Sequence, residues 1–252
     1  MSVLRGARPW FSLVVVFIAW WLAGQAGWLN ERILPGPWAV AKALGTLLVN
    51  GQLASALGAS LPRVGWGLLI GILSGLLLGF ASGYWRVGED VIDRPVQALK
   101  AIPFTALTPL FILWFGIGEW PKILLVAVGV AVPLYLNTFS GIRGVDRKLI
   151  EVAHVYDRRA LVIARDILLP GALPQILTGL RYGLSIGWVA LIVAESIAAS
   201  TGIGFLLTNA RGYSQTDVVI VCILVYALLG VLTDLIVRQL ERSLLRWRLA
   251  IH

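Results

Sequence analysis

The chain has 252 residues, of which 58% are hydrophobic and only 13% charged, and its formal net charge is +8. Soluble domains carry about 25% charged residues, so this composition excludes a water-soluble globule and indicates a multi-pass membrane protein. Basic residues collect in cytoplasmic loops, which explains the positive charge better than nucleic-acid binding does. The single cysteine, Cys222, excludes a disulfide within the chain, and no Cys/His metal cluster is present in the sequence.

A first membrane span is expected at residues 10–28. The segment is almost entirely apolar, has tryptophans near its ends, and is long enough to cross a hydrocarbon core of about 30 Å. A cleaved signal peptide is the alternative, since residues 23–26 resemble a cleavage site. We favour an uncleaved helix, because the segment is long for a signal peptide and the rest of the chain is equally apolar.

A short amphipathic helix is expected after the break at residues 34–37. Val40, Leu44, Leu47 and Leu48 would share one of its faces. The segment is too short and polar to span, so it is expected on the membrane surface or against the bundle.

The second span, residues 64–84, has a glycine at every fourth position. These glycines are Gly67, Gly71, Gly75, Gly79 and Gly83. In a helix they form a ridge without side chains, along which a second helix can approach closely. We predict a helix-packing role; a surface along which helices slide during transport is the alternative.

Four further spans are expected at residues 96–115, 123–139, 176–199 and 218–237. Pro103 and Pro109 are expected to bend the third span, and Pro133 the fourth. Pro170 and Pro174 are expected to bracket a turn before the fifth span.

The distribution of basic residues predicts the orientation. With the N-terminus in the cytoplasm, sixteen of the 21 lysines and arginines fall on the cytoplasmic side, including those of residues 85–100 and 143–165. This asymmetry favours about six helices with both termini in the cytoplasm. The sequence therefore predicts an all-α integral membrane protein whose residues 1–252 form one domain.

The sequence lacks the patterns typical of nucleotide hydrolysis and of zinc catalysis. The chain has no GxxxxGK[ST] phosphate-binding loop and no HExxH. Only Glu195 and Asp234 place carboxylates within predicted spans. A carboxylate in a span usually faces the bundle interior with a partner, so Glu195 either fixes the end of span five through an ion pair or acts as a gate.

Charged residues are concentrated at 146–170, inside the predicted loop 143–170. Residues 149–156 contain no helix breaker, Asp157 is suited to a turn, and residues 158–169 are again helical up to Pro170. The segment is either an inert connection or a cytoplasmic surface through which another protein moves the spans.

The same segment resembles the EAA motif of ABC-importer permeases, E-A-A-x3-G-x9-I-x-L-P. Glu151, Ala153 and the run Ile167–Pro170 match at the same spacing, whereas Val152 replaces an alanine and Asp157 replaces the glycine. The stretches IPFTALTPLFILWFGIG (102–118), LPGALPQILTGLR (169–181), VAESIA (193–198) and QTDVV (215–219) resemble the subgroup that imports aliphatic sulfonates, taurine and nitrate, and most closely its aliphatic sulfonate permeases.

The resemblance implies a type I ABC-importer permease in the bacterial cytoplasmic (inner) membrane. Two copies would form the translocation path, with two separate ATPase subunits beneath and a substrate-binding protein outside. ATP and Mg²⁺ would bind the ATPase, and this chain would hold no cofactor or metal and catalyse no reaction. The residues expected to couple to the ATPase are Glu151, Val152, Ala153, His154, Asp157, Leu169 and Pro170.

The resemblance implies a small anion as the substrate, and first of all an aliphatic sulfonate, with taurine or nitrate as alternatives within the family. An ion-driven secondary transporter is the alternative from another class, but it requires ion-coordinating groups near the membrane midplane. Glu195, Trp114 and Asn137 are candidate pathway or gate residues.

Overall fold

A computed structural model describes residues 2–156 and 158–245, without the side chains of residues 2–10, 12, 13, 104, 105 and 154. The described chain is helical and contains no strand. Its elements are α1 (Ser2–Gln25), α2 (Pro37–Val49), α3 (Gln52–Tyr84), α4 (Arg86–Gly88), the π-helix η1 (Glu89–Asp93), α5 (Arg94–Ala101), α6 (Phe104–Phe115), α7 (Glu119–Arg143), α8 (Arg147–Val155), α9 (Ala160–Ile163), the π-helix η2 (Ala164–Leu168), α10 (Leu169–Ala198), α11 (Ile203–Gly212) and α12 (Thr216–Leu244).

Four helical segments of the described chain are long and apolar enough to cross a membrane. They are Gln52–Tyr84, Glu119–Arg143, Ala160–Ala198 and Thr216–Leu244. The bent pair made of Arg86–Ala101 and Ala106–Phe115 brings the number to five if it is counted as one span. The first predicted span, residues 10–28, overlaps α1 and extends three residues past its end at Gln25; the described apolar part of this helix, Val14–Gln25, is shorter than a full span.

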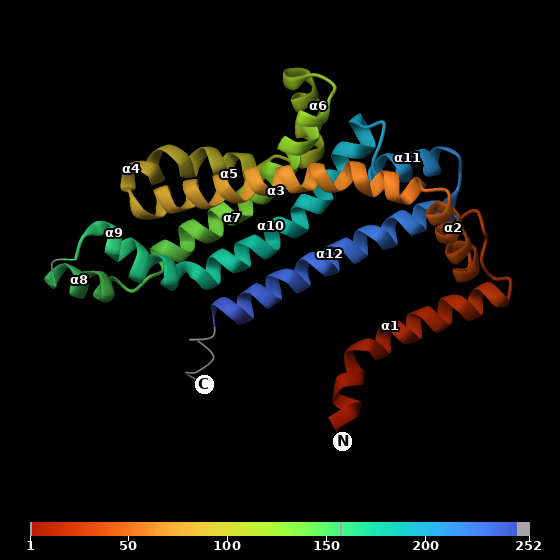
Figure 1. Cartoon of the computed structure of the whole chain (residues 1–252), viewed down its shortest axis with the longest axis horizontal. Helices are drawn as coiled ribbons and strands as arrows, with labels where there is room; N and C mark the ends of the chain where they lie inside the picture. The colour runs from red at the N-terminus through yellow and green to blue at the C-terminus, as the bar shows by residue number, and fades with distance from the viewer. Residues whose placement is uncertain (1, 157, 246–252) are drawn as a thin grey trace.

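Helix α7 is the central helix of the bundle, packed between α3 and α10 (Figure 1). The glycines of α3 face it: a Cβ added at Gly71 would lie 2.8 Å from the Cβ of Val130, and one at Gly79 would lie 2.7 Å from that of Thr138. On the opposite side, a Cβ at Gly183 of α10 would lie 2.9 Å from the carbonyl oxygen of Val130. Close backbone approach on two sides holds α7 in place without large interdigitating side chains.

The third predicted span is not one helix. Helix α5 ends at Ala101, Pro103 is the N-cap of α6, and the helix pair is bent by 115° at this break. Figure 1 shows α6 projecting away from the long helices. Residues before proline avoid the α-helical conformation, and Ile102 is accordingly extended, with φ −84° and ψ 123°. The proline therefore breaks this segment instead of bending it.

The expected turn between Pro170 and Pro174 is wrong, because the helix continues through both prolines. Residues Ala160–Ala198 form one apolar helical segment, with the π-helix η2 directly before Leu169. Proline lacks an N–H group and its ring clashes with the carbonyl four residues earlier. A wider π turn accommodates that clash, and η1 lies in the same position before Pro95.

Helix α2 has the expected position but a different buried face. Val40, Ala43 and Leu47 are buried, whereas Leu44 and Leu48 are exposed. The buried residues pack with Leu53 of α3 and Val221 of α12. The positions of these neighbouring helices therefore decide which face of α2 is buried, and the size of its apolar side chains does not.

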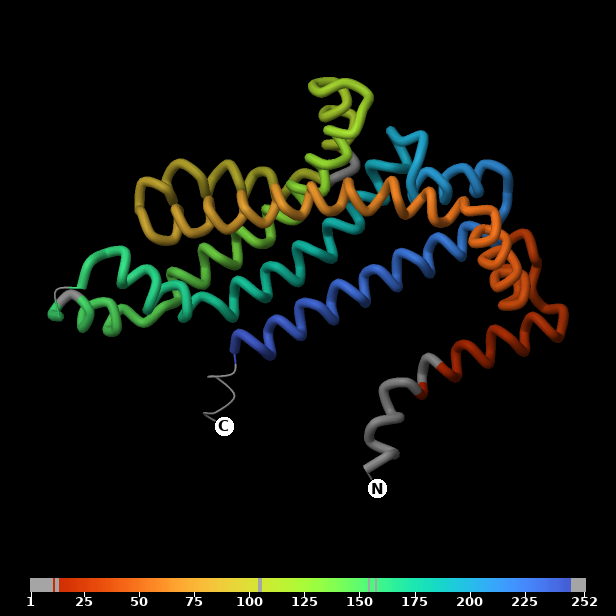
Figure 2. The backbone as a smooth tube through the Cα atoms, viewed as in Figure 1, coloured from red at the N-terminus to blue at the C-terminus, as the bar shows by residue number. Residues whose placement is uncertain are grey.

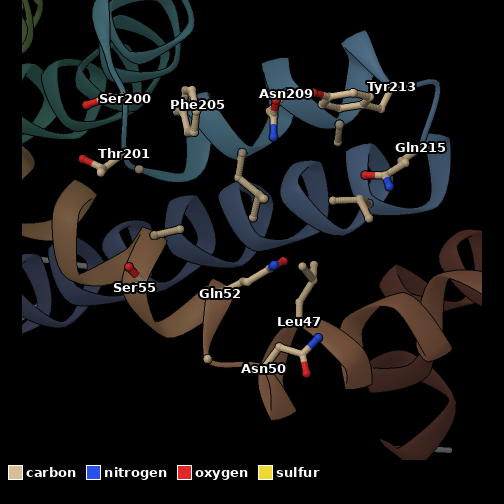
Figure 3. Close-up of a pocket in the computed structure, with 16 residues that line it drawn as sticks. Leu47, Asn50, Gln52, Ser55, Ser200, Thr201, Phe205, Asn209, Tyr213 and Gln215 are labelled. Carbon is tan, nitrogen blue, oxygen red and sulfur yellow. The ribbon is translucent and has the colours of Figure 1, made fainter.

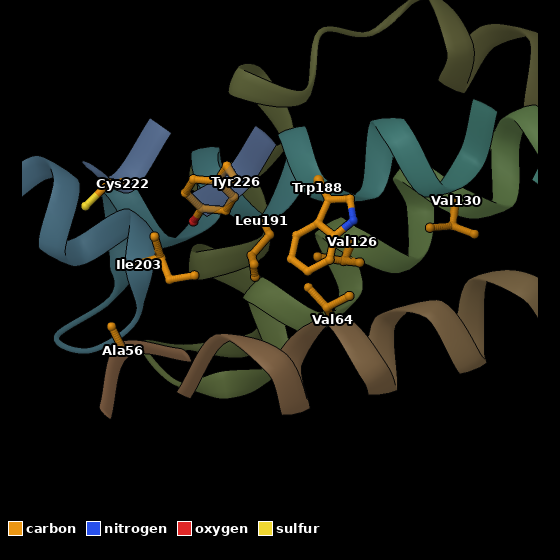
Figure 4. Close-up of a cluster of buried hydrophobic side chains, with 9 residues drawn as sticks. All are labelled: Ala56, Val64, Val126, Val130, Trp188, Leu191, Ile203, Cys222 and Tyr226. Atoms are coloured by element: carbon orange, nitrogen blue, oxygen red, sulfur yellow. The ribbon is translucent and has the colours of Figure 1, made fainter. Parts of the chain in front are cut away.

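The apolar core lies where α3, α7, α10, α11 and α12 converge (Figure 4). Val64, Val126, Trp188, Leu191 and Tyr226 are among its buried members. Helix α1 packs on α2 and lies apart from the long helices in Figures 1 and 2, which leaves many of its apolar side chains exposed.

Candidate functional site

The charged segment forms a compact cap on one end of the bundle (Figure 1). Asp146 directly precedes α8, and its Oδ1 accepts a hydrogen bond from the N–H of Lys148 at 2.9 Å. Ala153 and Ile163 are buried in a cluster with Leu134 and Ile142 of α7 and with Ile176 of α10. The cap is therefore anchored to two spanning helices by apolar contacts, and a force applied to it would reach both.

The outer face of this cap combines exposed apolar side chains with an acid. Val155 is 84% exposed and Leu161 80% exposed, and Tyr156, Val152 and Glu151 are also exposed. A cavity of about 450 Å³ opens between α8 and α9, lined by Ala153, Val162 and Asp166 among others. Exposed apolar side chains beside charged ones are typical of surfaces that contact a partner.

The remaining predicted coupling residues differ in position. Leu169 is exposed and Pro170 partly buried at the start of α10. His154 belongs to α8, but its side chain is outside the described part of the chain, as is Asp157 altogether. The expected turn at Asp157 therefore stays a prediction; on either side of it, the N–H of Arg158 donates to the carbonyl of Ala153 at 3.1 Å.

A buried ion cluster lies toward the other end of the long helices. Glu195 of α10 is 1% exposed, and its Oε1 lies 2.7 Å from Nη1 of Arg63 on α3, which is 4% exposed. Ser60 Oγ lies 2.8 Å from the same oxygen, and the N–H of Gly204 donates to Oε2 at 2.8 Å. The Tyr226 hydroxyl donates to Oε2 at 3.3 Å. Both oxygens of Glu195 thus have several partners, as a buried charge requires.

Arg63 extends the cluster to the start of α7. Its Nε and Nη2 contact the carboxylate of Glu119 at 2.5 and 3.0 Å, and Lys122 Nζ lies 2.9 Å from Glu119 Oε1. Arg63 also donates to the carbonyl and hydroxyl of Thr201, at 2.7 and 2.9 Å. One arginine and one lysine meet two glutamates, so the formal charges of the cluster balance. The cluster joins α3, α7, α10 and the loop before α11.

A polar pocket of about 660 Å³ adjoins this cluster, between α3, α11 and the turn after α2 (Figure 3). Asn50, Gln52, Asn209, Tyr213 and Gln215 contribute neutral hydrogen-bonding groups to its lining. The cluster positions one wall, because Ser60 Oγ accepts from the N–H of Ile203 at 2.9 Å and so holds the first turn of α11.

The three candidate pathway residues do not lie together. Glu195 is enclosed in the ion cluster, Trp114 is exposed near the end of α6, and Asn137 lines a separate cavity between α5, α7 and α10. That cavity also includes Lys100, which sequence analysis grouped with the cytoplasmic loop. The sequence did not identify Lys100, Glu119 or Ser60 as site residues. Ser60 and Glu119 contact Glu195 and Arg63, which are remote in the chain, and Lys100 shares its cavity with residues of α7 and α10.

Several apolar helices long enough to cross a membrane, packed closely through glycines on both sides of α7, define a multi-pass membrane protein. The chain belongs to the family of binding-protein-dependent transport system inner membrane components, whose pattern matches residues 67–246. This is a family of transporter permeases and not of enzymes, so the chain is a multi-pass inner-membrane transport component.

Relatives support this assignment over nearly the full chain. A protein of Escherichia coli K12 named as an aliphatic sulfonates transport permease is 48% identical, covering 99% of this chain and 95% of the relative. A protein of the same description from Bacillus subtilis 168 is 42% identical, covering 93% and 85%. The taurine transport system permease protein of E. coli K12 is 34% identical, covering 94% and 88%.

Solved structures support the fold. A chain of an amino acid ABC transporter is similar with a TM-score of 0.65 at 16% identity, covering 79% of this chain and 97% of the other. A chain of an inward-facing methionine ABC transporter has a TM-score of 0.56 at 22% identity, covering 78% and 97%. The fold is that of type I ABC-importer permeases.

Proposed function

We propose that this chain is the permease subunit of an ATP-driven importer of aliphatic sulfonates. The observation that carries the substrate class is the 48% identity, over 99% of the chain, to a relative named for aliphatic sulfonates. Two copies of the chain would enclose the path through the lipid bilayer, and a binding protein would deliver the sulfonate from outside. Taurine is itself a sulfonate, so the taurine permease at 34% identity represents the nearest alternative substrate.

The ATPase would dock on the α8–α9 cap. Two features support this: the outer face of the cap exposes Glu151 and apolar side chains, and its inner face is anchored on α7 and α10. Leu169 and Pro170 would join the docking surface where η2 passes into α10. Movement of the ATPase would then be passed to both helices, because Ala153 and Ile163 cannot shift without moving the residues packed around them.

ATP and Mg²⁺ would bind the ATPase subunits and not this chain. The sequence has no phosphate-binding loop, so the energy must come from a partner that has one. The cap would face the cytoplasm with both chain termini, since most basic residues lie at that end or in the termini. The polar pocket near α11 would then face outward, on the side from which the binding protein delivers substrate.

The test is uptake by the complete importer in proteoliposomes, with its ATPase and binding protein. Radiolabelled ethanesulfonate should accumulate only with ATP, and unlabelled ethanesulfonate should compete better than taurine or nitrate. A catalytically inactive ATPase should abolish uptake. Uptake that continues with the inactive ATPase and follows an ion gradient would instead establish a secondary transporter, and stronger competition by taurine would change the substrate.

A further inference from the structure

A second, smaller cavity lies between α5, α7 and α10. Its volume is about 250 Å³, and most of its wall is apolar, including Val128, Val132 and Ile186. Three polar side chains line it: Lys100 from α5, Asn137 from α7 and Tyr182 from α10. Three helices thus bring one cation, one carboxamide and one phenol to an otherwise apolar space.

The cavity lies at the middle of the spanning helices. Val132 is near the centre of α7 (Glu119–Arg143), and Tyr182 and Ile186 are near the centre of α10 (Leu169–Ala198). Lys100 reaches this level because α5 returns alongside α3 toward the centre of the molecule (Figure 1). Its position differs from that of a loop lysine, and ionisable groups at such depth usually serve substrate or ion pathways.

Lys100 has no ion-pair partner among the described residues, in contrast to Lys122, which pairs with Glu119. Tyr182 is 59% exposed, and its hydroxyl has no hydrogen-bond partner within the described chain. Asn137 donates one hydrogen of Nδ2 to the carbonyl of Pro133 at 2.9 Å and retains a second for a ligand. An unpaired cation beside two free donors is complementary to an anion.

We propose that this cavity is a substrate site for alkanesulfonates during their passage through the permease. The ammonium group of Lys100 pairs with the sulfonate, and the Tyr182 hydroxyl and Asn137 amide donate to its oxygens. The apolar wall takes the alkyl chain of the sulfonate. A site for an inorganic anion would not need such a wall. The inference rests on the proposed function, because the apolar wall and the cation together fit a sulfonate with an aliphatic tail.

The test compares Lys100→Met, Lys100→Arg and the matched control Lys42→Met in the complete reconstituted importer. Lys42 is an exposed lysine on α2, outside this cavity. Loss of a charged hydrogen bond should reduce ethanesulfonate uptake about ten-fold or more in Lys100→Met. Lys100→Arg should retain most uptake, and Lys42→Met should match the unmodified importer. Lys42→Met should also leave basal ATP hydrolysis and subunit assembly unchanged.

A chain-length measurement separates a substrate site from a structural role. Leu136→Ala shortens a side chain of the apolar wall and so enlarges the cavity. The ratio of hexanesulfonate to ethanesulfonate uptake should therefore increase several-fold, on the order of ten-fold at most. This ratio also decides the matter if Lys100→Met does not assemble. Equal uptake by Lys100→Met and Lys42→Met, or an unchanged ratio in Leu136→Ala, would overturn the site while the proposed function stands. Absence of sulfonate uptake by the unmodified importer would instead reject the proposed function.

Discussion

Nη1 of Arg63 lies 2.7 Å from Oε1 of Glu195, and this buried ion pair joins α3 to α10 across 132 residues of sequence. Burying either charge alone would cost several kcal/mol, so each residue depends on the other. Because Glu195 also accepts from Gly204, the pair fixes the start of α11 and with it one wall of the polar pocket.

Replacing Glu195 with alanine should strongly destabilise the permease. The change leaves Ser60 and Gly204 without their acceptor and reduces the charge that compensates Arg63, so we expect a loss of about 3–5 kcal/mol. Thermal unfolding in detergent measures it. Asp234→Ala is the control, because Asp234 also pairs with arginines in a span but is partly exposed, and it should cost about 1 kcal/mol or less. Similar losses in both variants would show that burial of Glu195 has no special importance.

Adding a methyl group to the glycine ridge should disturb the contact between α3 and α7. A Cβ at Gly75 would lie 2.8 Å from the carbonyl oxygen of Ala131, so Gly75→Ala should cost about 1–3 kcal/mol, and Gly75→Leu more. Gly65 is on the same helix with nothing within 4 Å of its Cβ position, so Gly65→Ala should be neutral or slightly stabilising. An unchanged melting temperature for Gly75→Leu would contradict the close packing.

Gly202 should be intolerant of any side chain for two reasons. Its φ is +115°, which side-chain-bearing residues rarely adopt, and a Cβ would lie 2.6 Å from Cδ of Glu195. Gly202→Ala should therefore cost about 1–3 kcal/mol. At the other end of α11, Gly212→Ala meets nothing within 4 Å and should leave the melting temperature nearly unchanged. Equal behaviour of the two variants would mean that α11 can move away from the ion cluster at little cost.

Reversing the charge of Glu151 should impair ATPase docking without unfolding the permease. Glu151 is exposed on α8, so Glu151→Lys should change stability by no more than about 0.5 kcal/mol. Co-purification of the ATPase and ATP-driven uptake should both fall sharply. Glu31→Lys makes the same change at an exposed site outside the cap and should leave both intact. Normal co-purification of Glu151→Lys would exclude the docking role.

Local sequence was sufficient for the class of protein and for most helices. A low charge content and long apolar runs require a membrane bundle, and the four-residue glycine spacing on α3 indicated a face for close helix contact. The charged block at 146–170 was recognisable because so many charges cannot lie in hydrocarbon. These conclusions depend only on composition and on the spacing of residues within one segment, so they need no knowledge of how the segments pack.

The partners of each polar side chain were decided only by the tertiary structure. The sequence suggested an ion-pair partner for Glu195 but could not select Arg63. It also grouped Lys100 with a cytoplasmic loop, although the reversal of the chain after Tyr84 directs α5 back alongside α3 toward the bundle centre. The helix through Pro170 likewise depends on a π turn that no propensity indicates. Such features arise from contacts between remote segments, and the free energy of those contacts is fixed by how the helices pack and not by the order of residues along any one of them.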